Sequence, residues 1–160
     1  MQSIIKFVLG IFVTVLSVIM VTPRSSVATT SDIYVINPST GIAMHGYDVV
    51  SYFTEQEAIV GLDNYEVEWD GNYWRFTNSA NADRFLEAPH AFLPQFNGYG
   101  AFAVASGFLA DGNPKIWALY ENQLFFFHSV NARNKWAENP TSYVDGGRLV
   151  WEKLSSQLVR

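Results

Sequence analysis

The sequence contains no cysteine, and this absence excludes several kinds of site. Without thiols the chain cannot form a disulfide framework, a zinc–thiolate site or an iron–sulfur cluster, and it has no cysteine nucleophile. Stability must therefore come from the hydrophobic core. Aromatic residues make up 16% of the chain, and each can bury a large apolar area, so they are the expected source of that core.

Basic residues are also scarce. The chain has 10 Lys and Arg against 15 Asp and Glu, a formal net charge of −5. Nucleic-acid binding requires a cluster of basic side chains, and the few cations of this sequence are scattered along it. We therefore expect no nucleic-acid partner.

The first 28 residues have the pattern of an export signal. Lys6 precedes an apolar run from Phe7 to Val21, and Ser26-Val27-Ala28 offers small residues at both positions that a signal peptidase reads. The run is shorter than the roughly 20 residues of a membrane-spanning helix, and Pro23 follows it closely. We interpret residues 1–28 as a cleaved signal peptide, with an uncleaved anchor as the alternative. We therefore expect the protein to be periplasmic or secreted, and to contact the membrane only through its leader before cleavage.

The rest of the chain is long enough for one domain. Residues 29–40 contain hydroxyl side chains around a short β-prone run and are interpreted as a lead-in segment. The domain itself is expected over residues 41–145. After Gly146-Gly147, apolar side chains recur every four residues, which predicts a closing amphipathic helix over residues 146–160.

Two parts of the domain share a β-hairpin-plus-helix pattern. Residues 65–69 alternate apolar with acidic side chains, Asp70-Gly71 is typical of a two-residue hairpin turn, and residues 73–77 resume the β-rich pattern. A similar hairpin is expected over residues 116–127. In each copy a helix should follow and end at a proline, and the small-residue run 101–107 between them predicts a buried strand.

A shift of 51 residues aligns the two copies. The aligned pairs are Phe76 with Phe127, Phe85 with Trp136, Glu87 with Glu138, Pro89 with Pro140 and Phe92 with Tyr143. Identical spacing through strand, helix and proline indicates a duplicated module. The predicted fold is therefore α+β, with two duplicated β-hairpin-plus-helix units packed into one small domain and closed by the C-terminal helix.

The repeat and two further motifs resemble the YHS-domain family, which is related to the metal-binding TRASH domains. Phe126-Phe127-His128-Ser129, followed by Trp136, Asn139-Pro140 and Tyr143, is similar to the family's core module. The segments GIAMHGYDVVSYF, residues 41–53, and QFNGYGA, residues 95–101, look like its secreted branch. The resemblance covers residues 41–145 and implies a hairpin that leads into a helix. It implies no particular activity, because that branch has no established biochemical role.

The resemblance implies metal ligands that this chain largely lacks. Metal-binding members of the family have cysteines directly after the motif phenylalanine and again three residues later. Those positions hold Thr77 and Ala80 in the first copy and His128 and Asn131 in the second. Secreted members often have a further cysteine where this chain has Gly100. Of the residues at these family positions, His128 is the only one that can ligate a metal.

The three histidines are the candidate metal ligands. His128 could form a three-nitrogen site for copper or zinc together with His45 and His90, but no spacing in the sequence brings them together. One imidazole does not hold a metal by itself. We favour the alternative, that His128 is a capping or hydrogen-bonded structural residue.

Tyr47, Asp48 and Tyr99 are the candidate small-molecule contacts. Tyr47 and Asp48 could place a phenol and an acid in a cleft, and Asp48 could act as a base if burial raised its pKa. The alternative is that Asp48 bonds turn amides while Tyr47 and Tyr52 pack, as such residues commonly do. We favour this alternative.

Other catalytic motifs are missing. No serine has a G-x-S-x-G setting, and no G-x-G-x-x-G or P-loop lysine occurs, so the sequence favours a protein that is not an enzyme. We expect an exported YHS-like binding domain with weak affinity for a transition metal or a small molecule. The alternative is a structural or interaction module that has lost the family's metal ligands; neither points to a particular protein partner.

Overall fold

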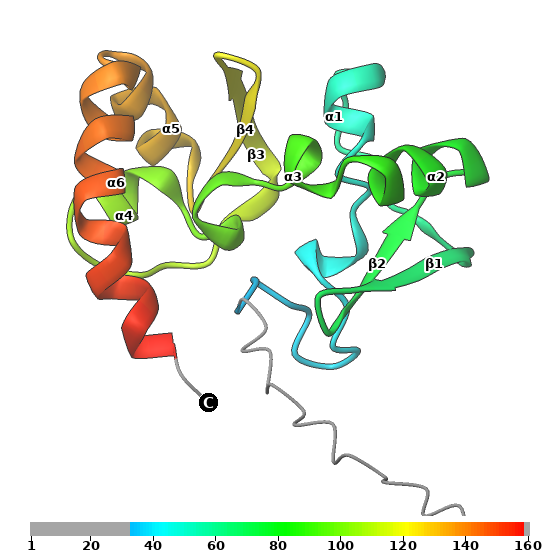
Figure 1. Cartoon of the computed structure of the whole chain (residues 1–160). Coiled ribbons are helices and arrows are strands. Elements are labelled where there is room, and N and C mark those ends of the chain that lie inside the picture. The colour runs from blue at the N-terminus through cyan, green and yellow to red at the C-terminus, as the bar shows by residue number, and fades with distance from the viewer. Residues whose placement is uncertain (1–32, 159–160) are drawn as a thin grey trace, which may run out of the picture.

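The computed structural model describes residues 33–158, and over this range the protein has an α+β fold. Two antiparallel two-stranded hairpins and their helices form two units that lie next to each other (Figure 1). The predicted fold class is confirmed. The predicted leader, residues 1–28, lies outside the described residues. None of the helices within residues 33–158 has the length and apolar character needed to cross a bilayer.

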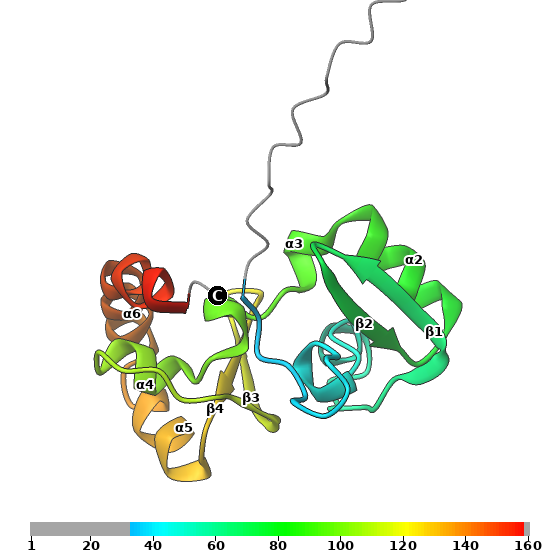
Figure 2. The same cartoon turned by 90° about the horizontal axis from the view of Figure 1, so that it is seen from below.

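The first unit spans residues 41–92 and the second spans residues 93–158. The first contains η1 (Met44–Gly46), α1 (Ser51–Thr54), β1 (Leu62–Trp69), β2 (Asn72–Phe76), α2 (Ser79–Glu87) and α3 (Pro89–Phe92). The second contains η2 (Gln95–Gly98), α4 (Ala101–Ala105), β3 (Asn113–Tyr120), β4 (Gln123–Phe127), α5 (Val130–Ala137), α6 (Pro140–Ser155) and η3 (Ser156–Leu158). Figure 2 shows both units from below.

The two hairpins have the same register after a shift of 51 residues. Leu62 pairs with Phe76 in the first hairpin, and the equivalent Asn113 pairs with Phe127 in the second. Each ladder is irregular over the same stretch, just after this pair. Helices α2 and α5 follow at equivalent positions. The duplicated hairpin-plus-helix arrangement predicted from the sequence is thereby confirmed.

The duplication also includes the turn before each hairpin, but there the shift is 52 residues. His45 and Gly46 have φ angles of 54° and 82°, and the equivalent Asn97 and Gly98 have 53° and 88°. The carbonyl of Gly46 accepts from the amide of Gly61 at 2.8 Å, and that of Gly98 accepts from the amide of Gly112 at 3.0 Å. The sequence analysis missed this extension, because one inserted residue breaks the alignment at the shift of 51.

Each hairpin packs one face against the helix that follows it. In the first unit the rings of Phe76 and Phe85 lie 5.1 Å apart, and in the second the rings of Phe127 and Trp136 lie 5.1 Å apart. Aromatic pairs at this distance bury large apolar areas and add a specific ring contact. These two contacts are the centres of the unit cores.

The opposite faces of the two hairpins differ. The first hairpin has Glu66, Glu68, Tyr73 and Arg75 on this face, and the equivalent residues of the second are Trp117, Leu119, Leu124 and Phe126. The ring of Tyr52 in α1 covers the second hairpin, 5.1 Å from Trp117 and 5.4 Å from Phe126. In the first hairpin Arg75 instead forms ion pairs with Asp63 and Glu66. Strand β4 of the second hairpin is therefore buried on both faces, whereas the first hairpin is solvated on one.

Residues 33–40 connect the two units. The amide of Val35 donates to the carbonyl of Asn97 at 2.9 Å, and its carbonyl accepts from the amide of Met44 at 2.8 Å. Ile36 and Ala43 form an isolated bridge. Because Val35 is buried and bonds both duplicated turns, residues 33–40 pack as part of the fold.

Residues 101–107 do not form the strand expected from the sequence. They contain helix α4, which begins after Gly100 and buries Ala101, Ala103 and Val104. Alanine is the best helix former, and a run of small residues has no periodicity that would separate a strand from a helix. Tertiary packing against α6 favours the helix here.

The C-terminal helix begins earlier than the predicted residue 146. Pro140 occupies the first turn of α6, where a missing amide hydrogen costs no hydrogen bond, and Asn139 caps the helix by accepting from the amide of Ser142. Gly146-Gly147 does not interrupt it. A Cβ on Gly147 would lie 2.7 Å from the ring of Phe96, so this glycine allows α6 to approach η2 closely. Helix α6 therefore runs without a break through residue 146.

Candidate functional site

Asp48 is a fully buried carboxylate, 0% exposed, at the start of α1. Its Oδ1 accepts from the amides of Val50 at 2.8 Å and Ser51 at 3.3 Å. Its Oδ2 accepts from the amide and the hydroxyl of Thr77 and from Nδ2 of Asn81, each at 2.8 Å. Asp48 therefore ties the first turn of α1 to the end of β2 and to α2.

This network leaves Asp48 little capacity for chemistry. A carboxylate has about four lone-pair sites, and five donors already converge on Asp48. A general base needs a free lone pair within hydrogen-bond distance of a substrate proton. The favoured interpretation from the sequence, in which Asp48 bonds turn amides, is confirmed, and the partners Thr77 and Asn81 add to it.

The second unit lacks this network. Gly100, His128 and Ala132 stand at the positions of Asp48, Thr77 and Asn81. A Cβ on Gly100 would lie 3.1 Å from the amide nitrogen of His128, so the two backbones approach more closely than an aspartate would easily allow. The two units thus share a backbone but differ in the polar group at this junction.

Tyr47 and Tyr99 are equivalent residues of the two units. Tyr47 is half-buried and forms a bridge with Val60, whereas Tyr99 forms a bridge with Asp111, and its ring lies 6.1 Å from Trp151 of α6. Their described contacts share no residue. Tyr47 thus lies in the first unit next to Asp48 in the chain, and Tyr99 lies in the second unit near α6.

Tyr52 is the buried phenol next to this network. Its hydroxyl donates to the carbonyl of Pro114 at 2.9 Å. Burial raises the pKa of Tyr52 far above its ordinary value, with smaller contributions from Tyr47 and Asp48. The phenol therefore stays protonated and acts as a hydrogen-bond donor between the units.

The three histidines lie on different elements. His45 is in the η1 turn, His90 is in α3 with its ring 5.6 Å from Trp69, and His128 follows β4. Nδ1 of His128 lies 3.2 Å from the carbonyl oxygen of Asp111, which is the hydrogen-bonded arrangement favoured from the sequence. Within residues 33–158 no three His, Cys, Asp or Glu side chains form a group that could hold a metal. The structure thus does not bring the three candidate ligands together.

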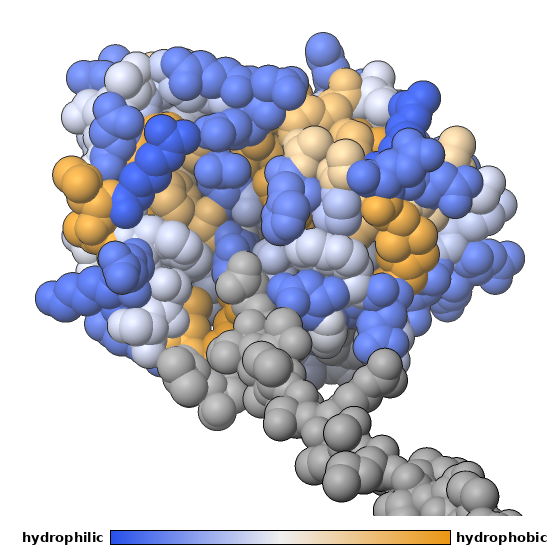
Figure 3. All heavy atoms as spheres, in the orientation of Figure 1, coloured by the Kyte–Doolittle hydropathy of each residue, from blue (hydrophilic) through white to orange (hydrophobic). Residues whose placement is uncertain are grey.

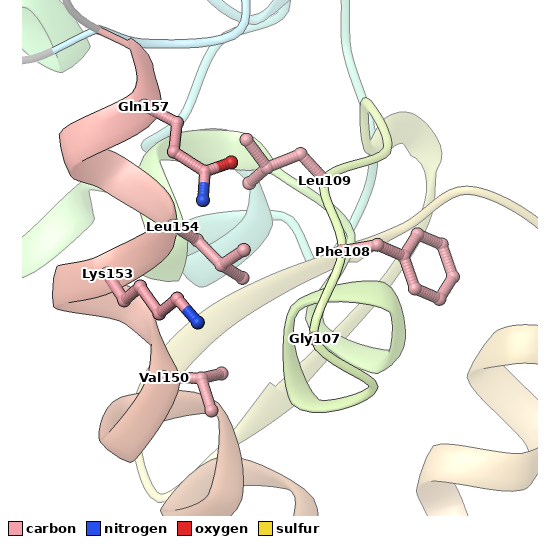
Figure 4. A pocket seen from close by; sticks show the side chains of 7 residues that line it. All are labelled: Gly107, Phe108, Leu109, Val150, Lys153, Leu154 and Gln157. Carbon is pink, nitrogen blue, oxygen red and sulfur yellow. The ribbon is translucent and has the colours of Figure 1, made fainter.

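A concave site that the sequence analysis missed lies between α6 and the loop after α4. We call it the α6 pocket. Its volume is about 320 Å³, and it is lined by Gly107, Phe108, Leu109, Val150, Lys153, Leu154 and Gln157 (Figure 4). The sequence signal was the spacing of Val150 and Leu154, from which only an amphipathic helix was predicted.

The lining side chains have distinct roles. Leu154 is buried at the base, while Lys153 and Gln157 are exposed and lie on the same side of the helix, four residues apart. In Figure 4 the side chains of Leu109, Leu154 and Gln157 converge, and the ring of Phe108 points away from them. The pocket is apolar at its base and polar along one side.

The surface around this pocket is of mixed polarity. Figure 3 shows a largely hydrophilic face on which apolar side chains come to the surface beside α6. Three large apolar residues of the second unit are exposed, namely Phe108, Val130 and Leu149. Phe108 is 53% exposed and Leu149 is 84% exposed. Exposed apolar residues occur in the first unit as well, where Val60, Leu62 and Leu86 are about half exposed.

No family model, curated protein or solved structure matches this chain.

Proposed function

We propose that this protein is an exported, non-catalytic binding domain of the YHS type, and that it holds a small molecule in the α6 pocket. The leader pattern of residues 1–28 supports export, and the duplicated hairpin-plus-helix units support the family. The α6 pocket is preferred to a copper or zinc site because His45, His90 and His128 do not meet.

The observation that carries the proposal is the form of the α6 pocket. Ligand sites are concave, mainly apolar and contain a few polar groups that orient the ligand. Leu109, Val150 and Leu154 provide apolar surface here, and Lys153 and Gln157 provide the polar groups. The volume of about 320 Å³ is at the lower end of the range of roughly 300–1,000 Å³ for ligand pockets, which fits a small ligand.

A non-catalytic role is supported by the state of Asp48 and Tyr52. The carboxylate is saturated with donors, and the phenol is committed to Pro114. Neither group is aimed into the α6 pocket, whose lining contains no carboxylate, histidine or hydroxyl. The pocket can therefore bind and orient a molecule; of the usual nucleophiles and bases its lining holds Lys153 alone, with no second titratable side chain beside it to form an acid–base pair.

The test is a fragment screen by saturation-transfer NMR with the purified chain. Hits should lose their signal in Gln157→Trp, where the indole fills the mouth of the pocket. Leu149→Trp is the matched control, because it adds a tryptophan at an exposed position of the adjoining helix α6, outside the lining. Fragments that bind both variants equally, or a screen with no hits, would reject the α6 pocket as the binding site.

The export part is tested separately by mass spectrometry of the protein recovered from the cell envelope. Cleavage after Ala28 gives a chain that begins at Thr29, four residues before the described range. An intact Met1 chain in the membrane fraction would support the anchor alternative instead.

An interaction module is the second proposal, and the exposure of Leu149 favours it. This leucine is 84% exposed on α6. Apolar side chains of this kind on a surface can mark a protein contact. Wild type should then recover a partner in a pull-down that Leu149→Gln does not, whereas equal recovery would contradict this role.

A further inference from the structure

We propose that the ligand of the α6 pocket is a small anionic amphiphile, with a carboxylate head and a short apolar body. This inference rests on the proposed function of the pocket and specifies the class of its ligand. It is carried by two polar side chains, Lys153 and Gln157, that line the pocket on either side of the apolar Leu154 (Figure 4).

Among the described residues that line the pocket, Lys153 is the only charged one. Within residues 33–158 none of the ion pairs involves it, so its ammonium has no carboxylate partner there. Ser155 and Ser156 donate to the carbonyls of Glu152 and Lys153 and thus cap the end of α6 without the lysine ammonium. The cation is therefore available to a ligand of opposite charge.

Gln157 supplies the second contact for a carboxylate. It stands one turn after Lys153, and in Figure 4 its amide is directed over the pocket. An ammonium and an amide NH₂ can donate to the two oxygens of one carboxylate, and a hydrogen bond to a charged group is stronger than one between neutral groups. A cationic ligand would be repelled by the positive charge of Lys153.

The distribution of charge along the chain agrees with an anionic ligand in this unit. The first unit, residues 41–92, has nine acidic and two basic residues, whereas residues 93–158 have five of each. The acidic surface thus belongs to the first unit, and the α6 pocket lies wholly in the balanced second unit. Long-range repulsion of an anion is weaker at this position than at the first hairpin.

The apolar base sets the size of the ligand body. Leu109, Val150 and Leu154 form a surface without hydrogen-bonding side chains. A volume of about 320 Å³ accommodates about ten water-sized groups at about 30 Å³ each. Octanoate, with ten non-hydrogen atoms, is therefore a suitable probe, and octanol and octylammonium are its neutral and cationic counterparts.

The experiment measures the binding of octanoate, octanol and octylammonium to the purified chain by NMR titration at low salt. Octanoate should bind about two- to fivefold more tightly than octanol, as expected for an exposed charge pair, and octylammonium should bind most weakly. In Lys153→Met, which keeps the apolar stem, octanoate and octanol should bind alike. Lys115→Met, an exposed lysine of β3, is the control and should keep the preference.

The outcomes separate the two proposals. If octanol and octylammonium bind the pocket as well as octanoate, the ligand class is wrong, but the pocket remains a binding site. If the preference for octanoate persists in Lys153→Met, its carboxylate is recognised elsewhere and the inference fails. If none of the three probes binds, the inference fails, and the fragment screen alone decides the proposed function.

Discussion

The hydroxyl of Tyr52 donates a hydrogen bond to the carbonyl of Pro114 across the junction of the two units, at 2.9 Å. Tyr52 belongs to α1 of the first unit, and Pro114 lies near the beginning of β3 in the second. The same ring packs on Trp117 and Phe126. This one side chain therefore joins the polar and apolar contacts between the units.

Replacement of Tyr52 by phenylalanine should lower the free energy of unfolding by about 1–3 kcal/mol, because the buried carbonyl of Pro114 loses its donor. Tyr73→Phe is the matched control. Its ring is 48% exposed, so its change should stay within about 0.5 kcal/mol. Urea unfolding followed by tryptophan fluorescence gives both values. Equal values for the two variants would show that the Tyr52 hydroxyl adds nothing to the junction.

Tyr52 should also make stability depend on alkaline pH. Burial raises its pKa in the folded state above the ordinary value of 10.0, so above pH 10 the unfolded phenol ionises while the folded one stays protonated. The contribution of Tyr52 is fully present below pH 10 and is lost as the pH rises beyond it. The advantage of wild type over Tyr52→Phe should therefore be constant from pH 7 to 9 and shrink above pH 10. An advantage that grows above pH 10 would contradict this assignment.

Asp48→Asn should be among the most destabilising conservative changes in the first unit. An amide keeps the shape but loses the charge, and its NH₂ group would face donors from Thr77 or Val50. We expect a loss of about 3 kcal/mol in the free energy of unfolding, since hydrogen bonds to a buried charge are strong. Asp83→Asn, at an exposed position of α2, should change it by less than about 0.5 kcal/mol. A loss below about 1 kcal/mol for Asp48→Asn would mean that the network is dispensable.

Arg75 and Phe126 occupy the same position in the two hairpins, and they allow a matched comparison of the solvated and the covered face. Phe126→Ala should cost about 3–5 kcal/mol, because it leaves a cavity beneath Tyr52. Arg75→Ala removes ion pairs with Asp63 and Glu66 at the surface, which should cost about 1 kcal/mol or less. Thermal unfolding of the two variants would reveal whether only the second hairpin supports the junction of the units.

The hairpins and their helices could be predicted because their signals are local. Asp70-Gly71 adopts the left-handed angles that a tight hairpin turn requires, and the apolar side chains around it alternate with a period of two. The repeat then transferred this assignment to the second copy. There Glu121 and Asn122 adopt similar angles without a glycine, so that turn was supported mainly by its alignment with the first.

The features that escaped prediction depend on contacts between distant segments. Helix α4 contains mostly small residues, and its packing on α6 rather than its sequence pattern decides its conformation. The α6 pocket combines Leu109 with Val150 and Leu154, which are some 40 residues away along the chain. The spacing of the histidines likewise could not reveal that η1, α3 and the end of β4 keep them apart. Residue patterns within single helices and strands thus predicted the two hairpin-plus-helix units, but they could not predict the α6 pocket, which forms between separate elements.

Gly146 and Gly147 are adjacent in α6, but their surroundings differ, and alanine should have opposite effects at the two positions. A Cβ on Gly146 would meet no atom within 4 Å, whereas one on Gly147 would lie 2.7 Å from the ring of Phe96. Gly146→Ala should raise the free energy of unfolding by about 0.5–1 kcal/mol, because alanine loses less backbone entropy in a helix. Gly147→Ala should lower it by about 1–3 kcal/mol, because α6 and η2 must move apart. Thermal unfolding at neutral pH measures both. If both variants are stabilised, Phe96 can turn aside and Gly147 is not required for the close approach of α6, whereas two destabilised variants would show that Gly146 also has a contact to protect.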